Sequence, residues 1–218
     1  MEDKPEKSRG KNAAPALSVK RIAKIAASLF FEKGYSQTTM REIGRACHIS
    51  PGHLYYYIKS KEEFPILFGN IRLNDIVQWE KKIRAAMADL KPDVCLRKAV
   101  REYVYSVHKR RKMIIFWYSV ARYLKREQLT GMYEIENRVI NVFREIIEKG
   151  CRSGEFSAGD PFLTAFHVEL VCQTWALKRY YLYKRYTLDQ FADVCEQQAI
   201  LMARGYPSAK RRSSPKSL

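Results

Sequence analysis

Residues 38–61, which read TTMREIGRACHISPGHLYYYIKSK, contain many side chains that can both donate and accept hydrogen bonds. Within this stretch, Ser50, Pro51, Gly52 and His53 precede a run of three tyrosines. Hydroxyl and imidazole groups can bond to base edges, a proline ring can touch a thymine methyl group, and a glycine permits close approach. The chemistry that these residue types favour is noncovalent recognition of a nucleic acid.

Capping signals predict the helices that would present these groups. Thr39 and Glu42 match a capping box, in which hydroxyl and carboxylate each bond to a backbone N–H of the first turn, so a helix is expected to begin there. Ser50 is a favourable N-cap, and Pro51 suits the first helical position because its missing N–H has no partner there. A second helix is therefore predicted to begin at Pro51.

This second helix must be short. Ser60 and Glu63 match another capping box, which predicts that a third helix begins just beyond. A helix of about two turns is not stable by propensity alone, so we expect it to be held by the packing of Leu54 and Ile58. Its front end would then be free to contact a partner.

The pair of short helices predicts a helix-turn-helix, in which the second helix enters the major groove with its N-terminus first. The candidates for base contacts are Ser50, Pro51, Gly52, His53 and Tyr55. The candidates for phosphate contacts are Thr38, Thr39, Arg41, Tyr56, Tyr57, Lys59 and Lys61. Plainer roles remain open, because Tyr57 could be a packing residue and Ser50 and Pro51 could simply cap a helix.

Residues 18–67 contain a series of ordered elements: Ile22, Ala26, Leu29 and Phe30, the turn Gly34–Tyr35, Thr38–Thr39, Ile43, Ile49 to Gly52, Leu54–Tyr55, and Ser60 to Glu63. With these elements, the segment resembles the N-terminal domain of the TetR family of bacterial transcription regulators. Three features depart from the family pattern: Ile58 stands where Phe is common, Cys47–His48 precede the turn, and Pro65 falls in the first turns of the third helix. Pro65 is expected to remove one backbone bond and to bend that helix.

Composition narrows the class of protein. The 218 residues carry a formal net charge of +17, which implies an anionic partner. We expect a cytoplasmic location, because the sequence has neither an apolar signal segment nor a stretch long enough to span a membrane. Five scattered cysteines argue against a disulfide scaffold and against a zinc site.

Apolar periodicity predicts an all-α protein of about nine helices. The expected units are a disordered basic arm (1–16), a TetR-type helix-turn-helix domain (17–62), a helical ligand-binding and dimerisation domain (63–205) and a disordered basic tail (206–218). In the third unit, one helix is expected to end at residues 108–111, with separate helices over 113–124 and from about 133 after an interruption at Thr130–Gly131. The next is expected over 161–182, and the last over 188–203.

The helix expected over 161–182 is apolar on two sides. One side would face the core of the chain and the other a second subunit, which predicts a homodimer through the last two long helices. The TetR resemblance implies the same dimer, in which the last two long helices of each subunit form a four-helix bundle. The two helix-turn-helix domains, which we call the DNA readers, would lie about one helical turn apart on a near-palindromic operator. The alternative is an interior helix of a monomer.

The C-terminal half is rich in aromatic residues. The candidates for lining a ligand cavity are Phe116, Trp117, Val120, Tyr123 and Trp175. A solid core is the alternative, but the resemblance implies a pocket for a small-molecule effector, which we expect to be largely apolar or acyl-CoA-like. Residues 109–112, KRRK, could hold an anionic head group at a helix start or could form a solvated turn.

The sequence shows no set of residues that favours catalysis. It lacks a G-x-S-x-G motif and a phosphate-binding glycine loop, and the spacing of Cys47, His48 and His53 matches no standard metal site. We expect no enzymatic activity, cofactor or metal. The predicted function is a ligand-responsive transcriptional regulator, most simply a repressor that binds double-stranded DNA. The alternatives are a DNA-binding protein without an inducer and a basic helical protein that binds anionic membranes.

Overall fold

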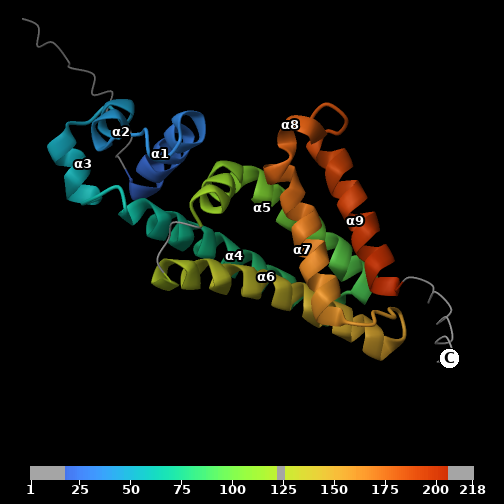
Figure 1. Cartoon of the computed structure of the whole chain (residues 1–218). Coiled ribbons are helices and arrows are strands. Elements are labelled where there is room, and N and C mark those ends of the chain that lie inside the picture. The colour runs from blue at the N-terminus through green and yellow to red at the C-terminus, as the bar shows by residue number, and fades with distance from the viewer. Residues whose placement is uncertain (1–17, 122–125, 206–218) are drawn as a thin grey trace, which may run out of the picture.

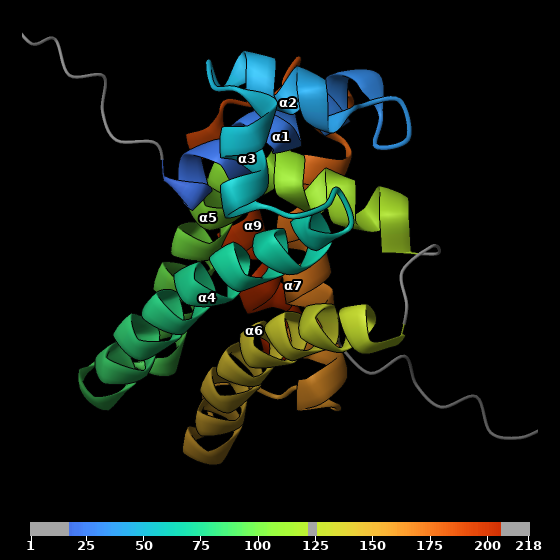
Figure 2. The same cartoon turned by 90° about the vertical axis from the view of Figure 1, so that its left-hand side faces the viewer.

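A computed structural model describes residues 18–121 and 126–205, with the side chains of 126–129 left aside. The expected arm (1–16) and tail (206–218) lie outside the described residues. The secondary structure described is entirely helical, as predicted, and its nine helices are α1 Val19–Lys33, α2 Met40–Ala46, α3 Pro51–Tyr57, α4 Glu63–Asp89, α5 Pro92–Val120, α6 Arg126–Ser153, α7 Pro161–Leu177, α8 Arg179–Leu182 and α9 Leu188–Arg204. Helices α1, α2 and α3 lie together at one end of the molecule, and α4 leads away from them into the remaining helices (Figures 1 and 2).

The predicted caps form at the starts of α2 and α3. The Thr39 side chain accepts from the backbone N–H of Glu42, and the Glu42 carboxylate accepts from the N–H of Thr39, which completes the capping box. The Ser50 hydroxyl oxygen accepts from the N–H of His53 at 3.2 Å, and Pro51 occupies the first position of α3. Both predicted helix starts are confirmed. They could be predicted from sequence because each cap depends on contacts within four residues.

The turn between α2 and α3 places a histidine in an unusual conformation. His48 has a φ of 58°, in the left-handed region that favours glycine, and it is the only residue other than glycine with a positive φ in the described ranges. The next residue, Ile49, donates its N–H to the carbonyl of Gly44 at 3.0 Å, which closes the turn. The departure seen in the sequence at Cys47–His48 therefore leaves the turn intact but strained.

The start of α4 differs from the prediction. The helix begins at Glu63, and its N-cap residue, Glu62, makes no side-chain capping bond. The Glu63 carboxylate accepts instead from the N–H of Lys59 at 3.2 Å, so the expected capping box with Ser60 is wrong. Pro65 is the third residue of α4, where a backbone N–H has no partner within the helix, so it removes no helical bond.

Helix α5 is continuous where two helices were expected. The KRRK block, 109–112, lies inside it rather than at a turn or a helix start, and Arg110 forms an ion pair with Asp75 of α4. No glycine or proline lies between Pro92 and Gly131, and lysine and arginine are good helix formers, so nothing local ends the helix at this point. The interruption expected at Thr130–Gly131 is also wrong, because both residues lie inside α6.

The helix expected over 161–182 is divided. Helix α7 ends at Leu177, Lys178 is its C-cap, and the short α8 follows at Arg179.

Two apolar cores form within the described part of the chain. One, in the C-terminal part, is built by α4 to α7 and α9, and the other lies under α1 to α3 and includes the start of α4 and the end of α5. No described helix is apolar over a length that would cross a membrane.

We expect the strain at His48 to be measurable. Both His48→Gly and His48→Ala remove the imidazole, but only glycine adopts the left-handed conformation without penalty. The glycine variant should therefore be more stable than the alanine variant by about 1 kcal/mol, as measured by urea unfolding. Equal free energies of unfolding for the two variants would show that the turn does not impose this conformation in solution.

Candidate nucleic-acid interface

The front of α3 is exposed and its back is anchored. Ser50, Pro51, Gly52 and His53 are all exposed, whereas Leu54 is 0% exposed and Ile58, just after the helix, is 2% exposed. A β-carbon built on Gly52 would meet no atom within 4 Å, so the surface there is open to a partner. Burial of the two apolar side chains holds a seven-residue helix that could not persist alone, as the sequence predicted.

The three tyrosines of α3 have different environments. Tyr55 is 49% and Tyr56 is 82% exposed, so both hydroxyl groups are accessible to a partner. Tyr57 is half-buried and packs against the core under α1 to α3. Its ring centroid lies 5.4 Å from that of His53 and 5.3 Å from that of Tyr56. Tyr57 therefore has a packing role, and it also supports the two side chains beside it.

Exposed polar and basic side chains lie in α2, in the turn before α3 and just after α3. The expected phosphate candidates Arg41 and Lys59 are exposed, and so are Arg45 and His48, which were not among the candidates. Arg45 precedes the turn by two residues, and a basic residue so close to a helix-turn-helix was the signal that could have found it. Arg41, Arg45 and Lys59 give the helix-turn-helix domain a cationic rim that suits a phosphate backbone.

Thr39 is exposed, but its side chain is engaged in capping. Its hydroxyl oxygen lies 3.1 Å from a carboxylate oxygen of Glu42, and Lys33 donates to the same carboxyl group at 2.7 Å. The hydrogen bonds from Lys33 and from Thr39 lower the pKa of Glu42 to about 2. The carboxyl group therefore stays ionised at neutral pH, and the capping box persists.

Thr38 does not lie where the sequence suggested. It is 0% exposed, and its hydroxyl donates to the carbonyl of Gly34 at 2.9 Å. The adjacent threonines look equivalent in sequence, but only Thr39 reaches the surface, because packing of the loop after α1 turns Thr38 inward. The prediction that Thr38 contacts phosphate is therefore wrong. The role of Thr38 is to close the end of α1.

Lys61 is committed to contacts inside the domain. Its ammonium group donates to the backbone carbonyls of Tyr35, Ser36 and Thr38 at 3.1, 3.4 and 3.2 Å, and it lies 4.6 Å from the centre of the Tyr35 ring. The three N–H donors of an ammonium group are thereby used, which leaves none for the phosphate contact expected of it. Lys61 positions the reader by joining the segment before α4 to the loop between α1 and α2.

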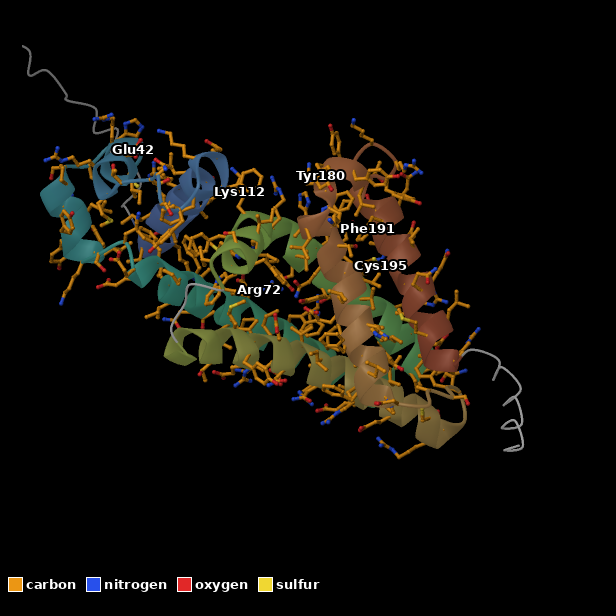
Figure 3. The ribbon with its side chains drawn as sticks, viewed as in Figure 1. Glu42, Arg72, Lys112, Tyr180, Phe191 and Cys195 are labelled. Atoms are coloured by element: carbon orange, nitrogen blue, oxygen red, sulfur yellow. The ribbon has the colours of Figure 1, made fainter. Side chains whose placement is uncertain are left out.

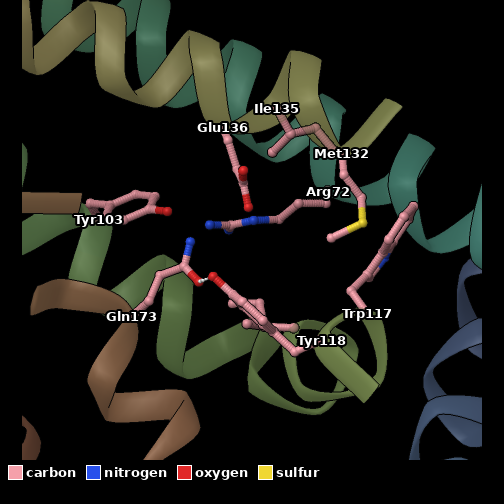
Figure 4. A pocket seen from close by; sticks show the side chains of 9 residues that line it. Arg72, Tyr103, Trp117, Tyr118, Met132, Ile135, Glu136 and Gln173 are labelled. Atoms are coloured by element: carbon pink, nitrogen blue, oxygen red, sulfur yellow. Dashed lines mark hydrogen bonds between the residues drawn. The ribbon is translucent and has the colours of Figure 1, made fainter. Parts of the chain in front are cut away.

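A small cavity lies inside the C-terminal part, between α4, α5, α6 and α7 (Figure 4). Its volume is about 50 Å³, which is room for water rather than for a drug-sized molecule. The apolar part of its wall comes from Ile114, Trp117, Met132 and Ile135. Arg72, Tyr103, Glu136 and Gln173 share the wall, so the cavity is more polar than the largely apolar, aromatic-rich one that was expected.

The polar groups of this cavity wall are joined by hydrogen bonds and by the guanidinium of Arg72, which lies 5.4 Å from the centre of the Tyr103 ring. Arg72 of α4 is 7% exposed and donates to the Ser106 hydroxyl at 2.6 Å. Tyr103 donates to the buried carboxylate of Glu169 at 2.8 Å, Gln173 donates to the same carboxylate, and Tyr118 donates to Gln173 at 2.7 Å. Figure 4 shows Arg72 reaching toward Tyr103 and Gln173 from the opposite wall.

Burial raises the pKa of two carboxyl groups in this region. Loss of solvent raises the pKa of Glu136, and the nearby charge of Glu169 raises it further. Burial also raises the pKa of Glu169, although bonds from Tyr103 and Gln173 and the charge of Arg72 oppose the shift. A charged group entering the cavity would change the protonation of these carboxyl groups.

The ligand candidates from the sequence are scattered. Trp117 lines the cavity, whereas Phe116 and Val120 are buried in the core under α1 to α3. Trp175 is buried and donates its indole N–H to His108 at 2.9 Å, and Tyr123 lies outside the described residues.

Sequence reasoning missed the polar wall of the cavity. Arg72 stands four residues from both Phe68 and Ile76 on the apolar stripe of α4, so a charged residue in that stripe was the available signal. No three His, Cys, Asp or Glu side chains come close enough to hold a metal ion in the part of the chain that the structure describes.

Comparisons with known proteins agree with this architecture. Residues 22–64 match the family model for bacterial regulatory proteins of the tetR family, and residues 89–176 match the tetracyclin repressor-like C-terminal domain. The HTH-type transcriptional regulator HbdR of Aromatoleum sp. (strain CIB) is 26% identical over 195 residues, which cover 88% of this chain and 82% of HbdR.

Solved structures share the fold over most of the chain. A regulatory protein of the tetR family from Rhodococcus RHA1 superimposes with a TM-score of 0.72 at 26% identity, covering 85% of this chain and 96% of its own. AibR, solved in complex with isovaleryl coenzyme A and operator DNA, superimposes with a TM-score of 0.67 at 23% identity, covering 85% and 98%. The helix-turn-helix, the all-helical C-terminal part and both family matches lead to one conclusion: this chain belongs to the TetR family of DNA-binding transcriptional regulators, which are not enzymes.

Proposed function

We propose that the protein is a dimeric, ligand-responsive repressor that acts in the cytoplasm on a palindromic operator and leaves it when an effector binds. The observation that carries this proposal is the α3 surface, where exposed Ser50, Pro51, Gly52 and His53 stand on a buried anchor of Leu54. An exposed helix front with a cationic rim fits the major groove of DNA.

The candidate residues divide by their position in and around α3. Ser50, Pro51, Gly52, His53 and Tyr55 are proposed to meet base edges, because they form the front of the helix. Arg41, Tyr56 and Lys59 are proposed to contact phosphates, with Thr39 and Tyr57 at the edge of that surface. Arg45 joins this set as a further cation. Lys61 is proposed to orient the reader rather than to touch DNA.

Helix α7 supports the dimer. Its buried face includes Ala165 and Val168, yet apolar side chains on its other face are exposed. Phe162, Phe166 and Leu170 recur at four-residue spacing, Leu163 lies next to Phe162, and α9 adds the exposed Leu201. A second copy of α7 and α9 would cover this surface and give two readers related by a two-fold axis.

The effector is proposed to bind in the small cavity between α4, α5, α6 and α7, and to be largely apolar or acyl-CoA-like. Ile114, Trp117, Met132 and Ile135 support an apolar part, and the likeness of fold to AibR, solved with isovaleryl coenzyme A, supports a thioester ligand. A cavity of about 50 Å³ must widen to admit such a molecule.

Helix α4 supplies the coupling. Arg72 in the cavity wall and Glu63 at the start of the helix are nine residues apart, or roughly 14 Å along a rigid helix. Displacement of Arg72 by an effector would therefore move the base of the reader and change the separation of the two readers in the dimer. Effector and operator must then weaken each other's binding by the same factor.

A DNA-binding protein without an inducer is the second candidate. The small volume of the cavity favours it, because a pocket already formed for a ligand is usually several times larger. A gel-shift assay with the DNA upstream of the protein's own gene, run with and without a long-chain acyl-CoA, separates the two. Release of the DNA supports the ligand-responsive repressor, and loss of any sequence-selective shift would refute both.

Tyr55→Ala and Lys59→Ala should affect DNA binding in different ways. The first removes a proposed base contact, so the preference for the operator over unrelated DNA should fall by about tenfold. The second removes a proposed phosphate contact, so all DNA should bind more weakly and the slope of log affinity against log salt should decrease by about 1. Fluorescence anisotropy at several salt concentrations measures both effects, and equal losses of selectivity would contradict this division.

Lys61→Ala should act through the fold. Removing the ammonium group breaks its hydrogen bonds to three carbonyls, of which that of Tyr35 still accepts from the N–H of Thr38, so the free energy of unfolding should fall by about 1 to 3 kcal/mol. The salt slope of DNA binding should stay at its wild-type value, in contrast to Lys59→Ala, because no phosphate contact is lost. A decrease of the slope with unchanged stability would restore Lys61 as a phosphate contact.

Phe166→Glu should disrupt the dimer. A carboxylate in the centre of the exposed α7 surface would be buried without a partner at the interface, which weakens association by at least a hundredfold. Sedimentation velocity should show monomers at micromolar concentration, with helicity unchanged by circular dichroism. Lys81→Glu on the exposed side of α4 is the matched control and should remain dimeric.

A further inference from the structure

Two adjoining hollows lie between the DNA reader and the C-terminal part. One, of about 450 Å³, is bounded by Lys24 and Ser28 of α1 and by residues 108–113 of α5. The other, of about 670 Å³, extends past residue 115 of α5 to the end of α7 and to α8. Both include Arg111 and Lys112, so we treat them as one basic groove. Either part is large enough for a substantial portion of a small molecule, unlike the cavity of about 50 Å³.

The positive charges in this groove are not balanced. Arg111, Arg179, Lys24 and Lys109 have no carboxylate within ion-pairing distance among the residues whose structure is described. Arg110, by contrast, is neutralised by Asp75 and points to α4. The basic groove thus brings like charges close together, and a bound anion would reduce the repulsion between them.

The charge of Arg179 acts on Arg111 and on His108 in this groove. Burial lowers the pKa of Arg111, and the charge of Arg179 lowers it further. His108, beside both, has a pKa lowered by burial and by the two guanidinium groups, so it is neutral at pH 7. Arg111 donates to the His108 carbonyl at 3.1 Å, and Arg179 lies 5.6 Å from the centre of the Trp175 ring. Most of their N–H donors have no acceptor in the described structure, although guanidinium forks suit phosphate oxygens.

Lys112 connects the groove to the DNA reader. Its ammonium donates to the Ser28 hydroxyl at 2.9 Å, lies 3.6 Å from the exposed carboxylate of Glu32, and lies 5.7 Å from the centre of the Phe31 ring. These three residues all belong to α1. Figure 3 shows Lys112 beside α1 and Tyr180 on α8, on the far side of the groove. An occupant of the groove would therefore touch the reader and the C-terminal part at once.

The walls of the groove include exposed aromatic rings. Tyr180 is 68% and Tyr183 is 55% exposed on and after α8, and Phe31 is 50% exposed on α1. Ile115 and Leu177 add apolar surface between them. A ligand that carries both an anion and a flat ring would use the guanidinium groups and the aromatic rings together, whereas inorganic phosphate would use only the charges.

We propose that the basic groove binds a phosphorylated organic anion with a flat ring, of the kind found in a nucleoside diphosphate or in the nucleotide end of coenzyme A. Tyr118 lines both this groove and the cavity under α6, so a chain attached to the bound anion would begin at the entrance to that cavity. The inference deepens the proposed effector response and rests on it only for the regulatory consequence, because binding to the groove is independent of any operator. Bound there, the anion holds α1 against α5.

Calorimetric titration of the full-length protein with coenzyme A, with ADP and with pyrophosphate tests the proposal without any DNA. Coenzyme A and ADP should bind, and Arg111→Gln should weaken both by at least about tenfold. Arg152→Gln removes the same charge from an exposed position at the end of α6 and should bind as the wild type does. Tyr180→Ala should weaken ADP and coenzyme A several-fold but leave pyrophosphate unchanged. Tighter binding of coenzyme A than of ADP identifies the acyl carrier as the source of the anion, and equal binding identifies a free nucleotide.

Several results would overturn the proposal. These are no binding of any of the three compounds, equal losses in Arg111→Gln and Arg152→Gln, or a larger loss of non-specific duplex DNA binding in Arg111→Gln than in Arg152→Gln, which would make the groove a DNA contact. Lys109→Gln, at an exposed position, guards against misfolding of the arginine variant and should weaken both nucleotides about threefold or more. Because no operator is present, failure here leaves operator binding and its release by an effector as a separate question.

Discussion

The packing of Phe30, Phe68 and Phe116 is the contact on which the rest of the molecule depends. Phe116 of α5 stacks on Phe30 of α1 with ring centroids 5.2 Å apart, and it meets Phe68 of α4 edge-on at 5.0 Å. One aromatic cluster thus joins the DNA reader to the two long helices that carry the C-terminal part. Without it, α1 to α3 would be tied to the chain chiefly through the segment before α4, and movement of α4 would reach them through that segment alone.

Polar contacts refine what this cluster holds. Lys61 joins the segment before α4 to the loop after α1, and Lys112 joins α5 to Ser28 of α1. Both lysines appear in the sequence as surface cations, yet both act between elements. The reader is therefore held from two directions, by α4 below it and by α5 beside it. A ligand in the cavity would act on the first of these supports, and an anion in the basic groove would act on the second.

Charge is distributed by role across the molecule. A net charge of +17 implied an anionic partner without locating it. The structure separates an exposed rim around α3 that includes Arg41, Arg45 and Lys59 from a half-buried group around Arg111 and Arg179. The first faces outward and suits the phosphates of a duplex. The second is enclosed by α1, α5 and α8, which suits a small anion better than a double helix.

The sequence by itself determined the helix starts at Thr39, Ser50 and Pro51, the all-helical class and the reader, because caps and apolar periodicity depend on residues within a few positions of each other. Tertiary structure decided which of two adjacent threonines is buried, that Lys61 faces inward, and that Arg72 stands in a cavity wall, because these outcomes depend on elements far apart in the chain. Sequence and tertiary structure together explain why α5 is continuous through 109–112. Lysine and arginine are helix formers and permit it, and the pairing of Arg110 with Asp75 and the burial of Phe116 against the reader stabilise it. Periodicity shows which residues share a face, and only the packed structure shows what that face meets.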